Sequence, residues 1–145
     1  MFDKILYPTD FSDVAKKALG YITKLKEAGS KEVIVLHVID ERTIGDICLL
    51  YPSRGSVEMV KRIKDEAYEE MDKIGARLRE EGFDVKLRIE RGIPLTEILR
   101  VEQEEGVSVI VLGSHGKSNV KEMLLGSVSE KVIRKSAKPV LVVKR

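Results

Sequence analysis

Two glycine-containing segments of the sequence have the composition of a phosphate-binding loop. Residues Gly113–Gly116 read Gly-Ser-His-Gly, and residues Gly126–Ser129 read Gly-Ser-Val-Ser. Glycine lets the backbone approach a ligand closely and adopt positive φ, so that several N–H groups can point at one anion. The serine hydroxyls add further donors. Because the second segment opens a predicted helix, its free N–H groups and positive dipole end also favour an anion.

A third polar segment, Pro8-Thr9-Asp10, follows the first predicted strand. The carboxyl ends of parallel strands meet at one edge of a sheet, and ligands bind where the strand order reverses. We therefore expect Asp10 to face the glycine segments if the first and fourth strands are neighbours. Asp10 is then a ligand-binding carboxylate, and the alternative is that it only caps the first helix.

Two common nucleotide-binding motifs do not fit these glycines. Gly116-Lys117-Ser118 resembles the end of a Walker A loop, but that motif requires a glycine five positions before Gly116, where the chain has Val111. The Gly-x-Gly-x-x-Gly fingerprint of dinucleotide-binding folds is also absent from the sequence. The glycines therefore indicate a different kind of phosphate site.

The elements that must position these segments alternate between strands and helices. Nearly continuous apolar runs predict buried strands, and apolar residues three and four positions apart predict helices. Alternation of this kind predicts an α/β fold with a single open five-stranded parallel sheet, of order 3-2-1-4-5, and helices on both faces. The predicted strands are 4–7, 32–39, 84–91, 107–112 and 139–143, and the predicted helices are 12–29, 57–81, 94–105 and 127–136.

Some parts of the chain are less regular. Residues 84–91 alternate apolar and charged side chains, which places this strand at a sheet edge. Residues 40–56 show no clear period, and we interpret them as an irregular insert. Such an insert is either a lid or contact surface, or a variable surface loop with a turn of helix. His37 lies in the middle of a strand among apolar neighbours, and we predict a core histidine.

The bulk composition fits one globular domain, residues 1–145. Lys and Arg total 26 against 24 Asp and Glu, and this balance argues against a dedicated nucleic-acid binder. No apolar run approaches the roughly 20 residues of a membrane span, so we predict no membrane partner. The first residues lack the pattern of a signal peptide, and the single Cys48 cannot form an internal disulfide. Together these features predict a cytoplasmic protein.

The spacing of the glycines resembles a known family signature. Gly113 and Gly116, separated by two residues and followed after nine residues by Gly126-Ser127, resemble the Gly-2x-Gly-9x-Gly-(Ser/Thr) signature of ATP-binding universal stress proteins. The similarity is greatest to archaeal members and covers the whole chain. It implies an adenine nucleotide alpha hydrolase-like fold, in agreement with the order 3-2-1-4-5. Further similar segments are the opening Ile-Leu-Tyr-Pro-Thr-Asp-Phe-Ser, residues 36–40 and residues 138–143.

The resemblance implies a role for each matching residue. Pro8, Thr9 and Asp10 would line the adenosine, Val38 would touch the adenine through its backbone, and Gly113 would contact the ribose. The phosphates would be surrounded by Ser114, His115, Gly116, Gly126, Ser127, Val128 and Ser129.

The resemblance also implies a homodimer through the last strand, Val140–Val143. This strand is short and apolar, and we expect it at a sheet edge. An open edge of this kind favours pairing with a second copy of the same strand.

The acidic residues bear on whether ATP is hydrolysed. Hydrolysis requires an aligned water and usually a metal held by carboxylates. Apart from Asp10, no acidic residue is clearly placed near the glycine segments, although Mg²⁺ or Mn²⁺ could bind through the phosphates with water ligands. We therefore favour a nucleotide-dependent switch in the stress response, acting on an unidentified protein partner. The alternatives are a slow or partner-stimulated ATPase and a dimeric scaffold that uses no nucleotide.

Overall fold

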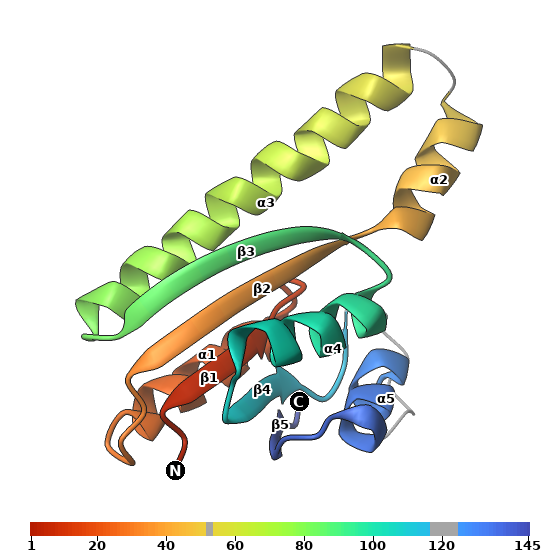
Figure 1. Cartoon of the computed structure of the whole chain (residues 1–145). Helices are drawn as coiled ribbons and strands as arrows, with labels where there is room; N and C mark the ends of the chain where they lie inside the picture. Colours follow the sequence, from red (N-terminus) through yellow and green to blue (C-terminus); the bar gives the residue numbers. More distant parts are fainter. Residues whose placement is uncertain (52–53, 117–124) are drawn as a thin grey trace.

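The computed structural model of the chain describes residues 1–51, 54–116 and 125–145 (Figure 1). Strands and helices alternate as predicted, with one additional helix. The strands are β1 Lys4–Pro8, β2 Glu32–Asp40, β3 Asp84–Gly92, β4 Val109–Gly113 and β5 Val140–Val143. The helices are α1 Asp13–Leu25, α2 Glu41–Leu50, α3 Arg54–Glu80, α4 Pro94–Glu105 and α5 Ser127–Lys135.

The strands form one parallel sheet of order β3-β2-β1-β4-β5, which confirms the predicted topology. β3 and β5 lie at the two edges, also as predicted. The order reverses at β1, because β2 lies on one side of it and β4 on the other. The carboxyl ends of β1 and β4 therefore open a crevice where a ligand can bind.

Two apolar layers hold the helices against the sheet, one on each face. Alternate residues of a strand point to opposite faces. In β1, Ile5 and Tyr7 therefore join the layer formed with α1 and α3, whereas Leu6 joins the layer formed with α4 and α5. The buried Tyr7 hydroxyl donates to the Ala15 carbonyl at 2.5 Å and ties the start of α1 to the sheet. Burial raises the pKa of Tyr7 to about 12.

The prediction of an irregular insert over residues 40–56 was wrong for most of its length, while residues 52–53 lie outside the described residues. Glu41–Leu50 is helix α2, and the Asp40 carboxylate caps it by accepting a backbone N–H of the first turn. Ile44 and Ile47 are its buried residues, while the other apolar residues of the helix face solvent. Two buried positions are too few to produce a recognisable helical period.

Helix ends differ from the predictions by a few residues. α1 ends at Leu25 rather than at Gly29, and α3 begins at Arg54 rather than at Val57. Gly106 ends α4 in the left-handed conformation, with φ of 59°, as expected for a glycine C-cap. Within the three described ranges, no helix has the combination of length and apolar character needed to cross a membrane.

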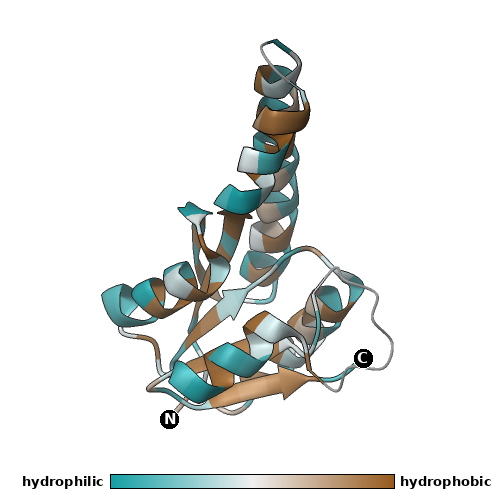
Figure 2. Ribbon diagram, turned by 90° about the vertical axis from the view of Figure 1, so that its right-hand side faces the viewer, coloured by the Kyte–Doolittle hydropathy of each residue, from teal (hydrophilic) through white to brown (hydrophobic). Residues whose placement is uncertain are grey.

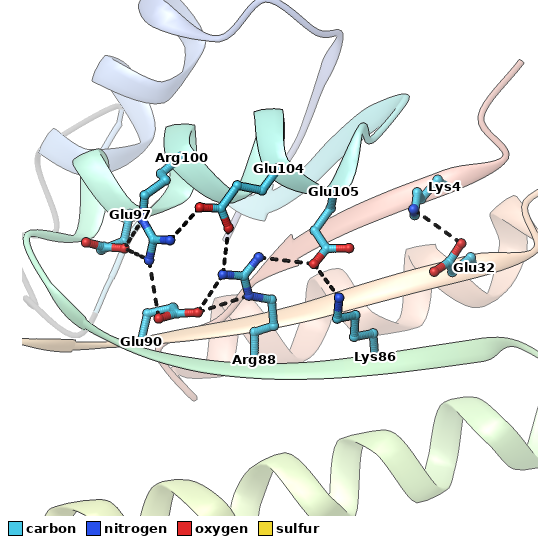
Figure 3. A network of polar contacts seen from close by, with 9 residues as sticks. All are labelled: Lys4, Glu32, Lys86, Arg88, Glu90, Glu97, Arg100, Glu104 and Glu105. Carbon is cyan, nitrogen blue, oxygen red and sulfur yellow. Dashed lines mark hydrogen bonds and ion pairs between the residues drawn. The ribbon is translucent and has the colours of Figure 1, made fainter.

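A network of ion pairs joins β3 to α4 on one side of the sheet (Figure 3). Arg88 is central to it and pairs with Glu104 at 2.9 Å and with Glu105 at 3.0 Å. Lys86 also pairs with Glu105, at 2.6 Å, and only 10% of the Glu105 side chain is exposed. Shared partners make such a network more stabilising than isolated surface ion pairs. Further members are Glu90, Glu97 and Arg100.

The network predicts a pH-dependent stability. Hydrogen bonding to Lys86, and also to Arg88, holds the pKa of the Glu105 carboxyl below its usual value. A carboxyl of this kind stabilises the fold above its unfolded-state pKa, and the contribution is lost as the pH falls through the lowered folded-state pKa. We expect Glu105→Gln to reduce the free energy of unfolding by about 1–2 kcal/mol near neutral pH. Urea unfolding measures this loss.

As the pH falls below the unfolded-state pKa of about 4 and then through the lowered folded-state pKa, the difference between Glu105→Gln and the wild type should shrink, because Glu105 becomes protonated first in the unfolded and then in the folded wild type. Glu66→Gln, on the exposed side of α3, is the control and should change little. A difference that stays constant from neutral to acid pH would contradict this account.

Candidate functional site

A cleft of about 550 Å³ opens at the carboxyl ends of β1, β2 and β4. Its volume lies within the roughly 300–1,000 Å³ that is typical of small-molecule sites. The structure thus brings together the segments that follow β1 and β4, as the strand order requires. All the predicted site residues except Ser114 line the cleft: Pro8, Thr9, Asp10, Val38, Gly113, His115, Gly116, Gly126, Ser127, Val128 and Ser129.

The segment after β1 turns sharply at the cleft. The Thr9 N–H donates to the Leu36 carbonyl at 2.8 Å, which holds Thr9 against β2. Two residues later, Phe11 has φ of 65°, a left-handed conformation that is strained for a residue with a side chain. Strained backbone persists where the surrounding structure fixes it, and it is concentrated at functional sites.

Asp10 is not the N-cap of α1. Ser12 has that role, and its hydroxyl accepts the Ala15 N–H at 3.3 Å. Asp10 Oδ1 instead accepts the Ser12 N–H at 3.0 Å. A Cβ at Gly116 would lie 2.9 Å from Asp10 Oδ2, so the carboxylate sits directly against the segment that follows β4. This position is the one expected of a ligand-binding carboxylate at the strand ends.

His37 is a half-buried cleft residue, which corrects the prediction of a core histidine. Its Nδ1 lies 2.8 Å from the Thr9 carbonyl oxygen, and its ring stacks on Phe11 with centroids 4.3 Å apart. The strand register explains the position, because Pro8 at the end of β1 pairs with Leu36. His37 is therefore the first residue of β2 that extends beyond the end of β1. The sequence signal for this half-buried position of His37 was that the predicted strand 32–39 is longer than the predicted strand 4–7.

The glycine segments fold against each other in the cleft wall. The Gly126 N–H donates to the Ser114 carbonyl at 2.7 Å, and the Ser114 N–H donates to the Val143 carbonyl at 2.8 Å. Gly126 has φ of −71°, so a positive φ does not explain this glycine. A Cβ at Gly126 would lie 3.3 Å from the Ser114 oxygen and 3.3 Å from the His115 Cα. Close approach of two backbones is therefore what this position requires.

Gly113 has a packing role that the sequence did not indicate. A Cβ at this position would lie 2.7 Å from Val14 Cγ1, 3.1 Å from the Val14 carbonyl carbon and 3.2 Å from the Ala15 nitrogen. The absence of a side chain at Gly113 thus lets the first turn of α1 rest on the end of β4. This contact positions α1 beside the cleft.

The N-terminus of α5 lies in the cleft wall without a side-chain cap. Its N-cap residue is Gly126, which has no side-chain oxygen to accept the N–H groups of the first turn. Ser127 and Val128 follow it and line the cleft. The first N–H groups of a helix carry a partial positive charge and commonly bind anions. This part of the cleft therefore fits a phosphate group.

The serine hydroxyls of the glycine segments differ in their surroundings. Ser129 is buried, and its hydroxyl donates to the Gly113 carbonyl at 2.8 Å. Ser114 is also buried, and its hydroxyl lies 2.7 Å from His115 Nδ1. These two hydroxyls brace the turn after β4. The Ser127 side chain is exposed and is the one best placed to reach a ligand.

The part of the cleft nearer to β2 has many apolar side chains beside the polar His37, Asp40 and Thr43. The predicted Pro8 and Val38 lie there, together with side chains from α2, α3 and α4 that the sequence analysis missed. Local patterns do not reveal such residues, because they come together only through long-range packing. A flat group with apolar faces and polar edges, such as a nucleobase, fits this end. The additional apolar residues are Ile39, Ile44, Ile63, Pro94 and Ile98.

Few carboxylates reach the cleft. Among the described residues that line it, the acidic ones are Asp10 and Asp40. Asp40 pairs with Arg42 at 2.7 Å, and hydrogen bonding to this guanidinium lowers the pKa of the Asp40 carboxyl. In the described ranges, no group of three or more His, Cys, Asp or Glu side chains could hold a metal ion. The described lining of the cleft therefore combines the N-terminus of a helix with many apolar side chains.

Comparison with known proteins identifies the family. The profile of the universal stress protein family matches residues 1–144. The chain belongs to the universal stress protein family. Universal stress protein MJ0577 of Methanocaldococcus jannaschii is 47% identical and matches 100% of this chain and 96% of its own length. Universal stress protein YxiE of Bacillus subtilis is 36% identical and matches 99% of this chain and 100% of its own length.

Solved structures agree with the family and with the fold. The structure of MJ0577 has a TM-score of 0.90 at 49% identity and covers 100% of this universal stress protein and 97% of its own chain. A universal stress protein from Archaeoglobus fulgidus in complex with dAMP has a TM-score of 0.65 at 23% identity, with 99% and 98% covered. The predictions of family and fold are thus confirmed, while the roles of single residues in ligand binding stay predictions.

Proposed function

We propose that this universal stress protein binds ATP in the cleft and acts as a nucleotide-dependent switch. The observation that carries the proposal is the uncapped N-terminus of α5, which faces a cleft whose other end has many apolar side chains. A nucleotide has the matching polarity, with anionic phosphates at one end and a flat base at the other. The A. fulgidus relative in complex with dAMP supports an adenine nucleotide as the ligand.

The residues divide between the two ends of the ligand in this proposal. Asp10 binds the ribose or base, and the backbone of Val38 contacts the adenine between the apolar side chains of β2 and α2. The N–H groups at the start of α5 and the segment after β4 bind the phosphates. The proposed phosphate-binding residues are Ser114, His115, Gly116, Gly126, Ser127, Val128 and Ser129, with the hydroxyls of Ser114 and Ser129 acting by bracing the loop.

Binding is better supported than hydrolysis. Asp10 Oδ1 is engaged with the backbone of Ser12, and Asp40 is paired with Arg42. These two carboxylates do not form a cluster that could hold a catalytic metal. Mg²⁺ or Mn²⁺ would therefore be held mainly by the phosphates and water. ATP occupancy would change the contacts with a protein partner in the cytoplasm. A slow or partner-stimulated ATPase is the enzymatic alternative.

Two measurements test the proposal. Protein purified without added ligand is denatured, and the released nucleotide is identified by chromatography, with ATP expected. Isothermal titration of nucleotide-free protein then measures the affinity for ATP. Failure of the folded protein to bind ATP in both experiments would overturn the proposal. Single-turnover phosphate release separates the alternatives, because one phosphate per site without any added factor would favour the ATPase.

We also propose a homodimer through the outer edge of β5. The Pro139 carbonyl accepts from Ile110 of β4, and the Val143 carbonyl accepts from Ser114 directly after β4. With a period of two, the backbone groups of Val140 and Val142 therefore point away from β4. Val142→Pro would remove one outward N–H without disturbing the pairing with β4. We expect a dimer for the wild type and a monomer for Val142→Pro by light scattering.

The matched control for the dimer is Val142→Thr, which keeps the N–H and should stay dimeric. A wild-type monomer at micromolar concentration would exclude the proposed dimer. A dimer that persists in Val142→Pro would place the interface elsewhere on the surface.

A further inference from the structure

The α2–α3 hairpin projects beyond the sheet (Figures 1 and 2), and exposed apolar side chains lie at its outer end. Five of the ten exposed large apolar side chains in the described ranges lie between residues 49 and 59. We call these five the apolar tip. Monomeric proteins rarely expose contiguous apolar groups without a binding role. The tip consists of Leu49, Leu50, Tyr51, Val57 and Met59, with exposed fractions of 83%, 73%, 50%, 68% and 36%.

The charges of α3 are separated along its length. Its outer part, residues 54–64, has four basic side chains and one acidic side chain, a net charge of +3. Its inner part, residues 65–80, has six acidic and three basic side chains, a net charge of −3. The first turn of α3 contains no acidic residue, although the helix dipole favours acidic side chains there. Helix stability therefore does not explain the basic outer part, which has the charge to bind an anionic partner.

The apolar and basic groups lie in a definite order along the hairpin. Three of the four basic side chains of the outer part, Lys61, Arg62 and Lys64, are four to seven residues behind Val57, which corresponds to about 6–10 Å along the helix. The fourth, Arg54, begins the helix at the tip, and its long side chain can extend back toward the headgroups. A bilayer surface has the same order, because anionic headgroups lie outside and hydrocarbon begins several Å deeper. Interfacial segments typically bury their apolar side by about 5–10 Å. Tyr51 at the tip is a residue type enriched at membrane interfaces.

We propose that the apolar tip inserts into the surface of an anionic phospholipid bilayer, with the basic outer part of α3 bound to the headgroups. Attachment of this kind requires no membrane-spanning helix. The expectation of no membrane partner rested only on the lack of a spanning run. A second copy is a poorer occupant of the tip, because two outer parts that both carry +3 repel each other.

Vesicle co-sedimentation tests the proposal with the full chain. The probes are vesicles of equal parts phosphatidylglycerol and phosphatidylcholine, and vesicles of phosphatidylcholine alone. We expect binding to the anionic vesicles that weakens with added salt, and at least about tenfold weaker binding to the neutral ones. Leu49→Ser with Leu50→Ser, or Lys61→Glu with Arg62→Glu, should each weaken binding to anionic vesicles by at least about tenfold.

Matched control variants lie outside the tip. Tyr68→Ser removes an exposed aromatic side chain from the acidic inner part of α3. Lys16→Glu with Lys24→Glu changes the net charge by the same amount as the double reversal on α3, but on α1. Both controls should bind anionic vesicles almost as the wild type does. All variants alter exposed residues, and thermal unfolding confirms that each is folded.

Cys48 gives an independent readout, since it is exposed beside the tip and is the only cysteine in the sequence. A polarity-sensitive fluorophore on Cys48 should shift to shorter wavelength and become shielded from an aqueous quencher when anionic vesicles are added. Absence of binding, equal loss in the control variants, or a label that stays accessible to the quencher would overturn the proposal. Lipid-independent self-association that is lost in Leu49→Ser with Leu50→Ser would overturn it in favour of a contact between copies.

Discussion

Gly126→Val is expected to weaken ATP binding by at least about a hundredfold, or about 3 kcal/mol, while the sheet stays intact. A Cβ at Gly126 already lies 3.3 Å from the Ser114 oxygen and the His115 Cα, and valine adds two methyl groups. The segment after β4 and the start of α5 must then move apart. Their N–H groups would no longer converge on one phosphate. Isothermal titration with ATP measures the loss.

Two further variants separate lost binding from lost folding. Gly20→Val is the matched control, because a Cβ at Gly20 has no atom of the described residues within 4 Å, and its ATP affinity should stay near the wild-type value. Ser127→Glu places a negative charge in the first turn of α5, where it favours the helix but repels phosphates. We expect this variant to melt at or above the wild-type temperature and to bind ATP more weakly. Wild-type affinity in both Gly126→Val and Ser127→Glu would contradict the proposed phosphate site.

Gly113→Ala is expected to reduce the free energy of unfolding by about 3 kcal/mol. This loss should occur in the nucleotide-free protein and therefore does not depend on ligand binding. The added Cβ would lie 2.7 Å from Val14 Cγ1, and the backbone of Val14 and Ala15 lies within 3.2 Å. A side chain could rotate away, but the backbone contacts can be relieved only by moving α1 off β4. Urea unfolding without nucleotide measures the change.

Gly116→Ala is the informative comparison for Gly113→Ala. Among the described residues, a Cβ at Gly116 would meet only the Asp10 Oδ2, at 2.9 Å, and a carboxylate can rotate. We expect a change in unfolding free energy below about 1 kcal/mol, with an effect on ATP affinity instead. Equal stability losses in the two variants would show that the packing of α1 on β4 does not distinguish these glycines.

The strands and helices could be predicted because the patterns that specify them lie within short segments of the sequence. The apolar run at 32–39 is typical of a strand covered on both faces, and Ile34 and Val35 are indeed fully buried on opposite faces. Ser12 caps α1 and Gly106 ends α4 as expected from their residue types. Strict alternation of strands and helices then left few topologies for the sheet.

The rest of the site depends on contacts that no local pattern carries. The position of His37 follows from the pairing of Pro8 with Leu36, which becomes known only when two strands are aligned. The contribution of Ile63 to the cleft requires α3 to return past the end of β2. Spacing singled out Gly113 as a candidate site residue, but the steric reason for a glycine there lies in Val14, about a hundred positions earlier in the chain.

The two edges of the sheet differ in a way that limits how the protein can assemble. β3 is nine residues long and lies between α3 and α4, and the ion pairs of Lys86 and Arg88 fasten it to α4. β5 is four residues long and carries Leu141, which is 39% exposed. Charged side chains on an edge strand discourage strand addition. If strand addition occurs only at β5, a pair of chains uses up both available edges, so growth stops at two copies and a fibre cannot propagate.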